Sequence, residues 1–127
     1  MRRFALALVF VASFAWLALP ARASSPRYRC VSGERIEEGS STVGHYRTSG
    51  SGVGIEKGSS TVGWVKRRGD RWAIETFGGS TLGWLVDGRI ETPGGSTRTT
   101  VDTARRLADC SDEVAAGIWV LQQDGRF

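Results

Sequence analysis

Four glutamates occupy the same place in a phrase that the chain repeats, and carboxylates in pairs can act as acid and base. The four are Glu37, Glu56, Glu75 and Glu91, and each directly follows an isoleucine. Glycoside hydrolysis needs two carboxyl groups roughly 5 to 9.5 Å apart in one cleft, whereas the repeat spreads its glutamates evenly. With Arg35, Lys57 and Arg89 close by in the sequence, we expect the glutamates on a solvated outer face. A small secreted carboxylate-dependent hydrolase is kept as the alternative function.

Other catalytic and metal-binding groups are scarce in the sequence. A serine nucleophile needs a base within hydrogen-bond reach, commonly a histidine. The chain has one histidine, His45, at a position where the sister repeats carry tryptophan. The hydrolase motif Gly-x-Ser-x-Gly, zinc-ligand spacings and the calcium-loop motif are absent from the sequence. We therefore predict a protein that is not an enzyme and that uses no cofactor or metal ion.

Two cysteines, Cys30 and Cys110, stand near the two ends of the expected mature chain. In an exported protein an even pair is most simply a disulfide. Such a bond would close a loop of about 80 residues and contribute on the order of 4 kcal/mol in the chain-entropy model. The alternative is a metal-binding or redox pair, which would be expected to show Cys-x-x-Cys spacing or supporting histidines.

One short phrase recurs four times with small changes. Its copies span residues 36–44, 55–63, 74–83 and 90–97, and the first reads Ile-Glu-Glu-Gly-Ser-Ser-Thr-Val-Gly. A phrase repeated at this period is typical of one supersecondary unit stacked several times. Strand-like stretches punctuated by glycine-rich turns every 8 to 10 residues or so indicate short antiparallel strands. Each unit is therefore predicted to be a β-hairpin.

The expected fold is all-β, a pseudo-symmetric, flower-like array of short antiparallel hairpins with one short helix near the C-terminus. Residues 24–127 form a single hairpin-repeat domain in this prediction, with repeats near 35–50, 54–70, 73–88 and 89–122. A capping residue and helix formers place the short helix at 102–110. The segment 115–121 resembles a late copy of the second strand of a hairpin.

Equivalent columns of the repeats separate the two faces of the expected strands, because side chains alternate along a strand. Tyr46, Val65 and Leu85 form an apolar column that shares a face with Gly44, Gly63 and Gly83. We assign this face to the core, with glycine where backbones crowd. The column directly after the glycine holds His45, Trp64 and Trp84 and is expected to be partly exposed to solvent. Trp64 and Trp84 either pack between hairpins or stack sugar rings or peptide side chains.

The Gly-Ser-Thr-Val-Gly phrase, flanked by Ile-Glu and by an Asp-Gly or Gly-Asp turn, resembles the bacterial five-fold beta-flower family. The resemblance covers residues 28–125, and three units match well, while the fourth reads Ser-Thr-Arg-Thr-Thr at 96–100. It implies short hairpins arranged around a central pseudo-symmetry axis. It implies no established activity, cofactor or catalytic residue.

The first residues have the form of a secretory signal peptide over 1–23. Two arginines precede an uncharged run at 4–19, and a small-residue exit follows it, with cleavage expected after Ala23. The alternative is an uncleaved membrane anchor, but the run is shorter than the about 20 residues that a spanning helix needs. We expect an exported protein, periplasmic or extracellular, without a transmembrane segment after cleavage.

Removal of the signal peptide would lower the formal net charge from +4 to +1, because Arg2, Arg3 and Arg22 leave with it. The remaining basic residues occur in pairs and form no patch of the kind that binds nucleic acid. We predict an exported, non-catalytic β-repeat domain, an envelope-associated binding or structural module whose partner is a cell-envelope glycan or protein. Homotypic assembly through an unpaired strand edge is a further possibility.

Overall fold

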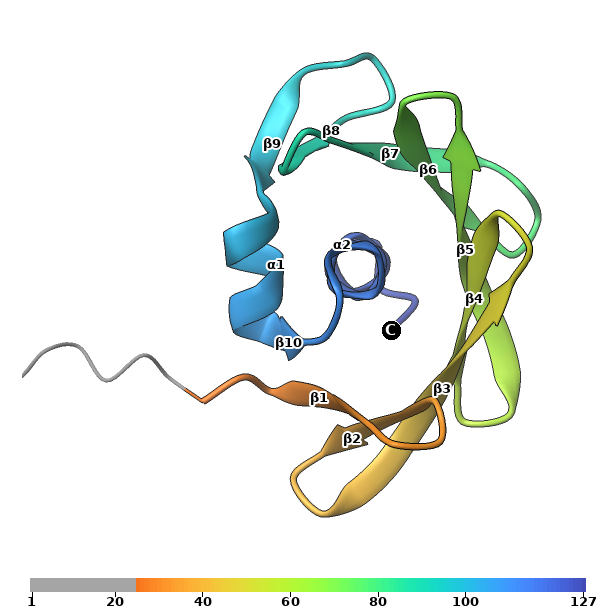
Figure 1. Cartoon of the computed structure of the whole chain (residues 1–127), viewed down its shortest axis with the longest axis vertical. Coiled ribbons are helices and arrows are strands. Elements are labelled where there is room, and N and C mark those ends of the chain that lie inside the picture. Colours follow the sequence, from red (N-terminus) through yellow and green to blue (C-terminus); the bar gives the residue numbers. More distant parts are fainter. Residues whose placement is uncertain (1–24) are drawn as a thin grey trace, which may run out of the picture.

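A single curled sheet surrounds one central helix in this protein (Figure 1). The computed structural model describes residues 25–127, and the predicted signal peptide at 1–23 lies outside the described residues. The strands are β1 (Tyr28–Val31), β2 (Arg35–Glu38), β3 (Ser41–Ser49), β4 (Gly52–Lys57), β5 (Ser60–Arg68), β6 (Arg71–Thr76), β7 (Thr81–Val86), β8 (Arg89–Glu91), β9 (Thr97–Thr100) and β10 (Ala108–Asp109). The helices are α1 (Val101–Leu107) and α2 (Asp112–Gln123).

The sheet is a meander that comes back to its own beginning. Strands β1 to β9 are neighbours in chain order and pair antiparallel, and β10 pairs parallel with β1, with Tyr28 opposite Ala108. Helix α1 carries the chain from β9 to β10, so that the strands and α1 together encircle α2 (Figure 1). The prediction of an all-β hairpin fold with a short helix near the C-terminus is confirmed.

The prediction that residues 115–121 form a strand is wrong, because they belong to α2. Seven residues of this helix, Val114 to Ile118, Val120 and Leu121, are buried. A continuous apolar run has the same appearance in a buried strand and in a buried helix, so periodicity could not separate them. At the centre of a ring of strands the helix is favoured, because it satisfies its backbone hydrogen bonds internally whereas a lone strand would leave them unpaired.

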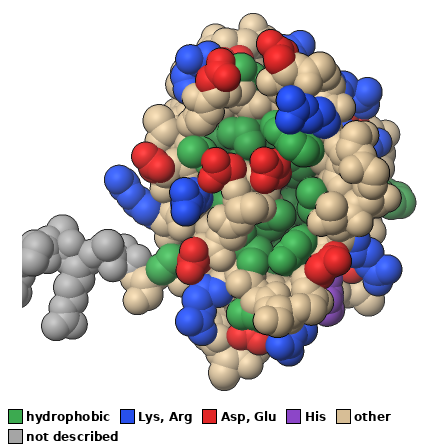
Figure 2. Space-filling view, in the orientation of Figure 1, with side chains coloured by type: hydrophobic (Ala, Val, Ile, Leu, Met, Phe, Trp, Pro, Cys, Tyr) green, Lys and Arg blue, Asp and Glu red, His purple; other side chains and the backbone are tan. Residues whose placement is uncertain are grey.

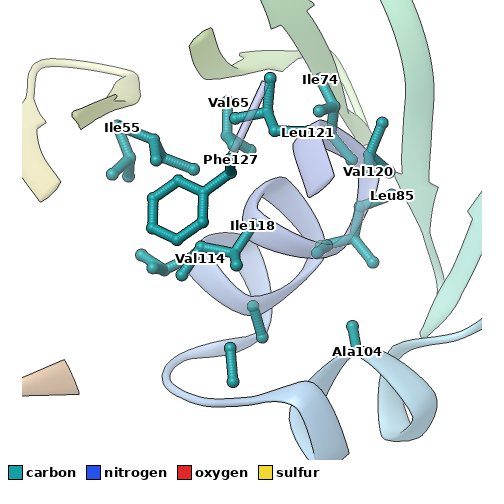
Figure 3. Close-up of a cluster of buried hydrophobic side chains, with 14 of the residues drawn as sticks. Ile55, Val65, Ile74, Leu85, Ala104, Val114, Ile118, Val120, Leu121 and Phe127 are labelled. Atoms are coloured by element: carbon teal, nitrogen blue, oxygen red, sulfur yellow. The ribbon is translucent and has the colours of Figure 1, made fainter. Parts of the chain in front are cut away.

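The core lies between α2 and the inner face of the sheet. Figure 2 shows hydrophobic side chains gathered in the middle of the molecule in this view, with most of the Lys and Arg side chains toward its edge. The isoleucine that opens each repeat points inward, and all four copies, Ile36, Ile55, Ile74 and Ile90, have no exposed surface. Figure 3 shows Ile55 and Ile74 converging with Val65 and Leu85 on Ile118 and Leu121 of α2. Val65 and Leu85 are buried, which confirms the predicted core column at these two positions, and Tyr46 is partly buried and packs against the core.

Every repeat has a β-bulge at the same place, directly after its isoleucine. In the first hairpin Ile36 pairs with Gly44 but Glu37 pairs with Thr42, which leaves Val43 as the extra residue. Val62, Leu82 and Arg98 are the extra residues of the other three hairpins. Bulges bend a strand and increase its twist, so a bulge in every repeat favours a sheet that curls around a helix.

The glycine that ends the repeated phrase is required by the hairpin that follows it. A Cβ on Gly63 would lie 2.6 Å from the carbonyl oxygen of Glu75, and one on Gly83 would lie 2.6 Å from that of Glu91. Thr99 stands at this place in the fourth hairpin, opposite Ile90. Within the described sheet no strand follows β9, so the crowding is absent and a side chain is tolerated there.

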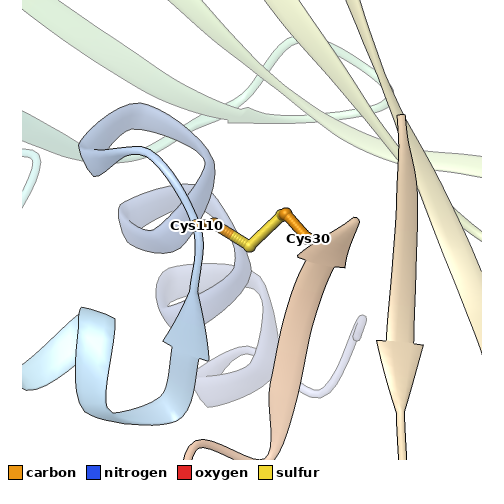
Figure 4. The surroundings of a disulfide bond; sticks show 2 residues. All are labelled: Cys30 and Cys110. Carbon is orange, nitrogen blue, oxygen red and sulfur yellow. A yellow bond between two sulfur atoms is a disulfide. The ribbon is translucent and has the colours of Figure 1, made fainter. Parts of the chain in front are cut away.

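The predicted disulfide between Cys30 and Cys110 is confirmed, with Cα atoms 5.1 Å apart. Figure 4 shows that it joins β1 to the segment between β10 and α2. It therefore fastens the parallel pair that brings the two ends of the meander together. The bond is compatible with an exported protein. In residues 25–127 none of the helices has the length and hydrophobicity needed to span a membrane.

Replacing Gly63 by alanine tests the close approach of successive hairpins. The added Cβ collides with the Glu75 carbonyl and with Leu121, so we expect the free energy of unfolding to fall by about 1–3 kcal/mol in urea titrations. Gly94→Ala is the matched control, because the nearest atom to its Cβ is Thr92 Oγ1 at 3.9 Å. Equal stability of the two variants would contradict the crowding described above.

Candidate functional site

The outer face of β4 and β5 is the part of the sheet where polar, aromatic and small residues meet. Val53, Ile55 and Val65 are buried toward α2, so the alternate positions point away from the core. Those positions hold Gly52 and Gly54 on β4 and Trp64, Lys66 and Arg68 on β5. Gly54 pairs with Trp64 and Gly52 with Lys66 across the two strands.

Trp64 lies flat over the backbone of β4. A Cβ on Gly54 would lie 2.9 Å from the indole Cζ3, so glycine is the residue that lets the ring approach this closely. Beside the ring is an open hollow of about 260 Å³ lined by Ser49, Ser51, Gly52, Trp64 and Lys66. The Lys66 ammonium is 5.5 Å from the centre of the ring. The hollow thus combines an aromatic wall, two hydroxyl-bearing residues and a cation.

Trp84 occupies the equivalent place in the next hairpin, and a guanidinium of its own chain lies over its ring. The Arg71 guanidinium lies 3.6 Å from the centre of its ring, and its indole N–H donates to the Pro93 carbonyl oxygen at 3.3 Å. Ala73 pairs with Trp84 where Gly54 pairs with Trp64. The structure therefore separates the two predicted tryptophans: Trp64 borders open space, whereas Trp84 is packed by groups of its own chain.

The difference between the hairpins traces to one position, three residues before the repeat's isoleucine. Gly33, Gly52 and Arg71 stand there in the first three repeats. Both glycines line open hollows, and the hollow beside Gly33 measures about 470 Å³ and is also bordered by His45 and Arg47. Arg71 instead covers the ring of its own hairpin. A glycine at this position leaves the space beside the aromatic side chain open.

The prediction of solvated repeat glutamates is wrong, although they do lie on the outer side of the strands. Their side chains are between 4% exposed, for Glu75, and 19% exposed, for Glu37. Glu75 accepts a hydrogen bond from Arg68 at 3.1 Å and lies 3.9 Å from the Lys66 ammonium. Both basic side chains come from β5, where Trp64 lies directly opposite Glu75.

The other repeat glutamates are likewise held by basic side chains. Glu37 pairs with Arg35, Glu56 with Arg47 and Glu91 with Arg89, at distances of 3.8, 3.2 and 3.3 Å. None of the four glutamates is among the residues that line the two hollows. Within residues 25–127 no cluster of three or more His, Cys, Asp or Glu is placed to hold a metal ion. The arrangement provides stacking and hydrogen bonding rather than a pair of free carboxylates.

The sequence did not reveal the hollow beside Trp64, although it identified Trp64 and Trp84 as candidate binding residues. The missing signal was the column that contains Gly33, Gly52 and Arg71. Among the first three repeats only the third has arginine in place of glycine, which indicates that this repeat fills a space that the first two leave open. This change can be interpreted only when the strand register is known, because the register places the column diagonally opposite the aromatic residue.

No family model, curated protein or solved structure matches this chain. The resemblance to the beta-flower family therefore depends on the repeated phrase and stays a prediction. The role of Trp64 and Trp84 in binding stays a prediction as well.

Glu75→Gln tests whether the covered glutamates support the fold. The change keeps the shape but removes the charge that faces Arg68 and Lys66, so we expect the free energy of unfolding to fall by about 1–2 kcal/mol. Glu38→Gln is the control, because Glu38 is 40% exposed and its pair with Arg27 is open to water. We expect a much smaller loss for the control in the same urea titration. Similar losses in both variants would show that burial of Glu75 does not matter.

Proposed function

We propose that the mature chain is an exported, non-catalytic β-repeat domain that binds a component of the cell envelope at Trp64. The signal-like first residues and the disulfide support export, and both a periplasmic and an extracellular site suit such a protein. The partner class is a cell-envelope glycan or protein. A helical membrane anchor within residues 25–127 plays no part in this proposal.

The observation that carries the proposal is the open hollow beside the Trp64 ring. Aromatic rings with a few fixed polar groups are the usual components of sites that bind small ligands. Here the ring borders the hollow together with Ser49, Ser51 and Lys66. Sugar rings present one apolar face and many hydroxyl groups, so a glycan suits this combination better than an apolar peptide side chain.

The scaffold holds these groups in place before any ligand arrives. Trp64 rests on the Gly54 backbone, Val53 and Val65 anchor the two strands in the core, and the Arg67 N–H donates to the Ser51 carbonyl oxygen at 2.8 Å. A binding surface that is already ordered loses less conformational entropy on association. The site is therefore suited to bind a ligand on a rigid face of the sheet.

The alternative of a carboxylate-dependent hydrolase draws little support from the repeat glutamates. Glycosidic chemistry needs two carboxyl groups in one cleft with different protonation states. Each repeat glutamate instead contacts a basic side chain on the outside of the sheet. We therefore propose binding as the function.

A pull-down with envelope material from the cells that make the protein tests this proposal. We expect Trp64→Ala to reduce retention of the exported chain at least roughly tenfold, because loss of a stacked ring removes on the order of 1–3 kcal/mol. Trp84→Ala is the matched control, since the Arg71 guanidinium already lies over that ring. Circular dichroism confirms folding of both variants. Full retention of a folded Trp64→Ala variant would overturn the proposal.

A further inference from the structure

We propose that the hollow beside Trp64 selects a sugar ring that carries a carboxylate, with Lys66 as the ionic partner. This inference rests on the proposed envelope-binding function and names the chemical class of the ligand. The sugar ring would lie against the indole, its carboxylate would face the Lys66 ammonium, and its hydroxyl groups would meet Ser49 and Ser51.

The size of the hollow fits a single ring. Its volume of about 260 Å³ is just below the roughly 300–1,000 Å³ of pockets that enclose drug-sized molecules. The residues that line it come from the β3–β4 turn on one side and from β5 on the other. A monosaccharide unit at the end of a chain or along it can therefore enter from the open side.

The Lys66 ammonium is only weakly paired within the protein and is therefore available to a ligand. Its nearest acidic oxygen belongs to Glu75 at 3.9 Å, the outer limit of an ion pair, and Arg68 approaches the same carboxylate more closely at 3.1 Å. The Lys66 side chain is 42% exposed. Glu75 is almost fully covered and is paired with Arg68, so the positive charge that an anion in the hollow meets is that of Lys66.

The neighbouring hairpin explains why the ligand is an anion rather than a cation. Arg71 stacks on Trp84, and the residue of that hairpin equivalent to Lys66 is Val86, which does not repel a guanidinium. At Trp64 the same stacking position would bring a cation next to the Lys66 ammonium. The replacement of valine by lysine thus excludes cationic groups and favours acidic ones.

The hollow beside Gly33 contains a similar pair, His45 and Arg47, but its cation is engaged. The Arg47 guanidinium lies 3.2 Å from Glu56, closer than Lys66 lies to Glu75. Its aromatic wall is also the smaller imidazole ring. The Trp64 hollow is therefore the primary site, and the assignment applies to that hollow alone.

Calorimetric titration with trigalacturonic acid and with its methyl ester tests the assignment. The two probes share their rings and differ in the charge of the carboxyl groups. We expect the exported chain to bind the acid at least tenfold more tightly than the ester. Lys66→Gln should weaken binding of the acid about tenfold and leave the ester unchanged, whereas Lys66→Arg should retain most of the preference for the acid.

A second variant fills the hollow beside Trp64, as Arg71 fills the equivalent space beside Trp84 in the third repeat. Gly52→Leu fills the space beside Trp64 with an uncharged side chain that Lys66 does not repel, and it should abolish binding of the acid. A Cβ at Gly52 would lie 3.2 Å from the Val65 carbonyl oxygen, so thermal unfolding must confirm that this variant folds. If it does not fold, the Lys66 variants still decide the question.

Three results would overturn the assignment. Equal binding of the acid and the ester, preference for the acid that survives Lys66→Gln, or no binding of either probe would each remove the acidic sugar as the ligand class. The envelope pull-down separates these failures from a failure of the proposed function. Retention that still depends on Trp64 keeps the envelope-binding proposal, whereas retention that is independent of Trp64 removes it.

Discussion

Packing of four repeated isoleucines against one central helix is the constraint on which this structure depends. The four isoleucines are buried in one hydrophobic cluster together with residues of α2, and a single two-stranded hairpin has too little apolar surface to be stable alone. The hairpins must therefore share α2 as a common core and lie close enough to leave room only for glycine at Gly63 and Gly83. The bulge after each isoleucine supplies the curvature that brings successive hairpins around the helix.

This arrangement divides the sheet into a constrained face and a variable one. The inner face repeats nearly the same residues because every hairpin contributes to one shared core, whereas the outer face differs between hairpins. The column at Gly33, Gly52 and Arg71 is the clearest example, because it either opens a hollow or fills it without disturbing the core. Binding chemistry can therefore change from one repeat to the next while the fold stays the same.

Much of the fold was predictable because its signals are local or repeated. The hairpins follow from the glycine-rich phrase, the core column from the alternation that contains Val65 and Leu85, and the Cys30–Cys110 bond from cysteine number and compartment. Helix α2 was not predictable, since strands β4 to β7, which pack against it, are distant in the sequence. The cover over Glu75 and the hollow beside Trp64 likewise depend on which strands are neighbours.

Native-state hydrogen exchange of the wild type and of Ile118→Ala most directly tests whether the hairpins depend on α2. Ile118 is fully buried in the core, and its truncation should cost about 2–5 kcal/mol. If the helix is the shared core, amides in β4, β5 and β6 will lose as much protection as amides in α2. Hairpin amides that keep their wild-type protection while α2 alone exchanges faster would contradict this account.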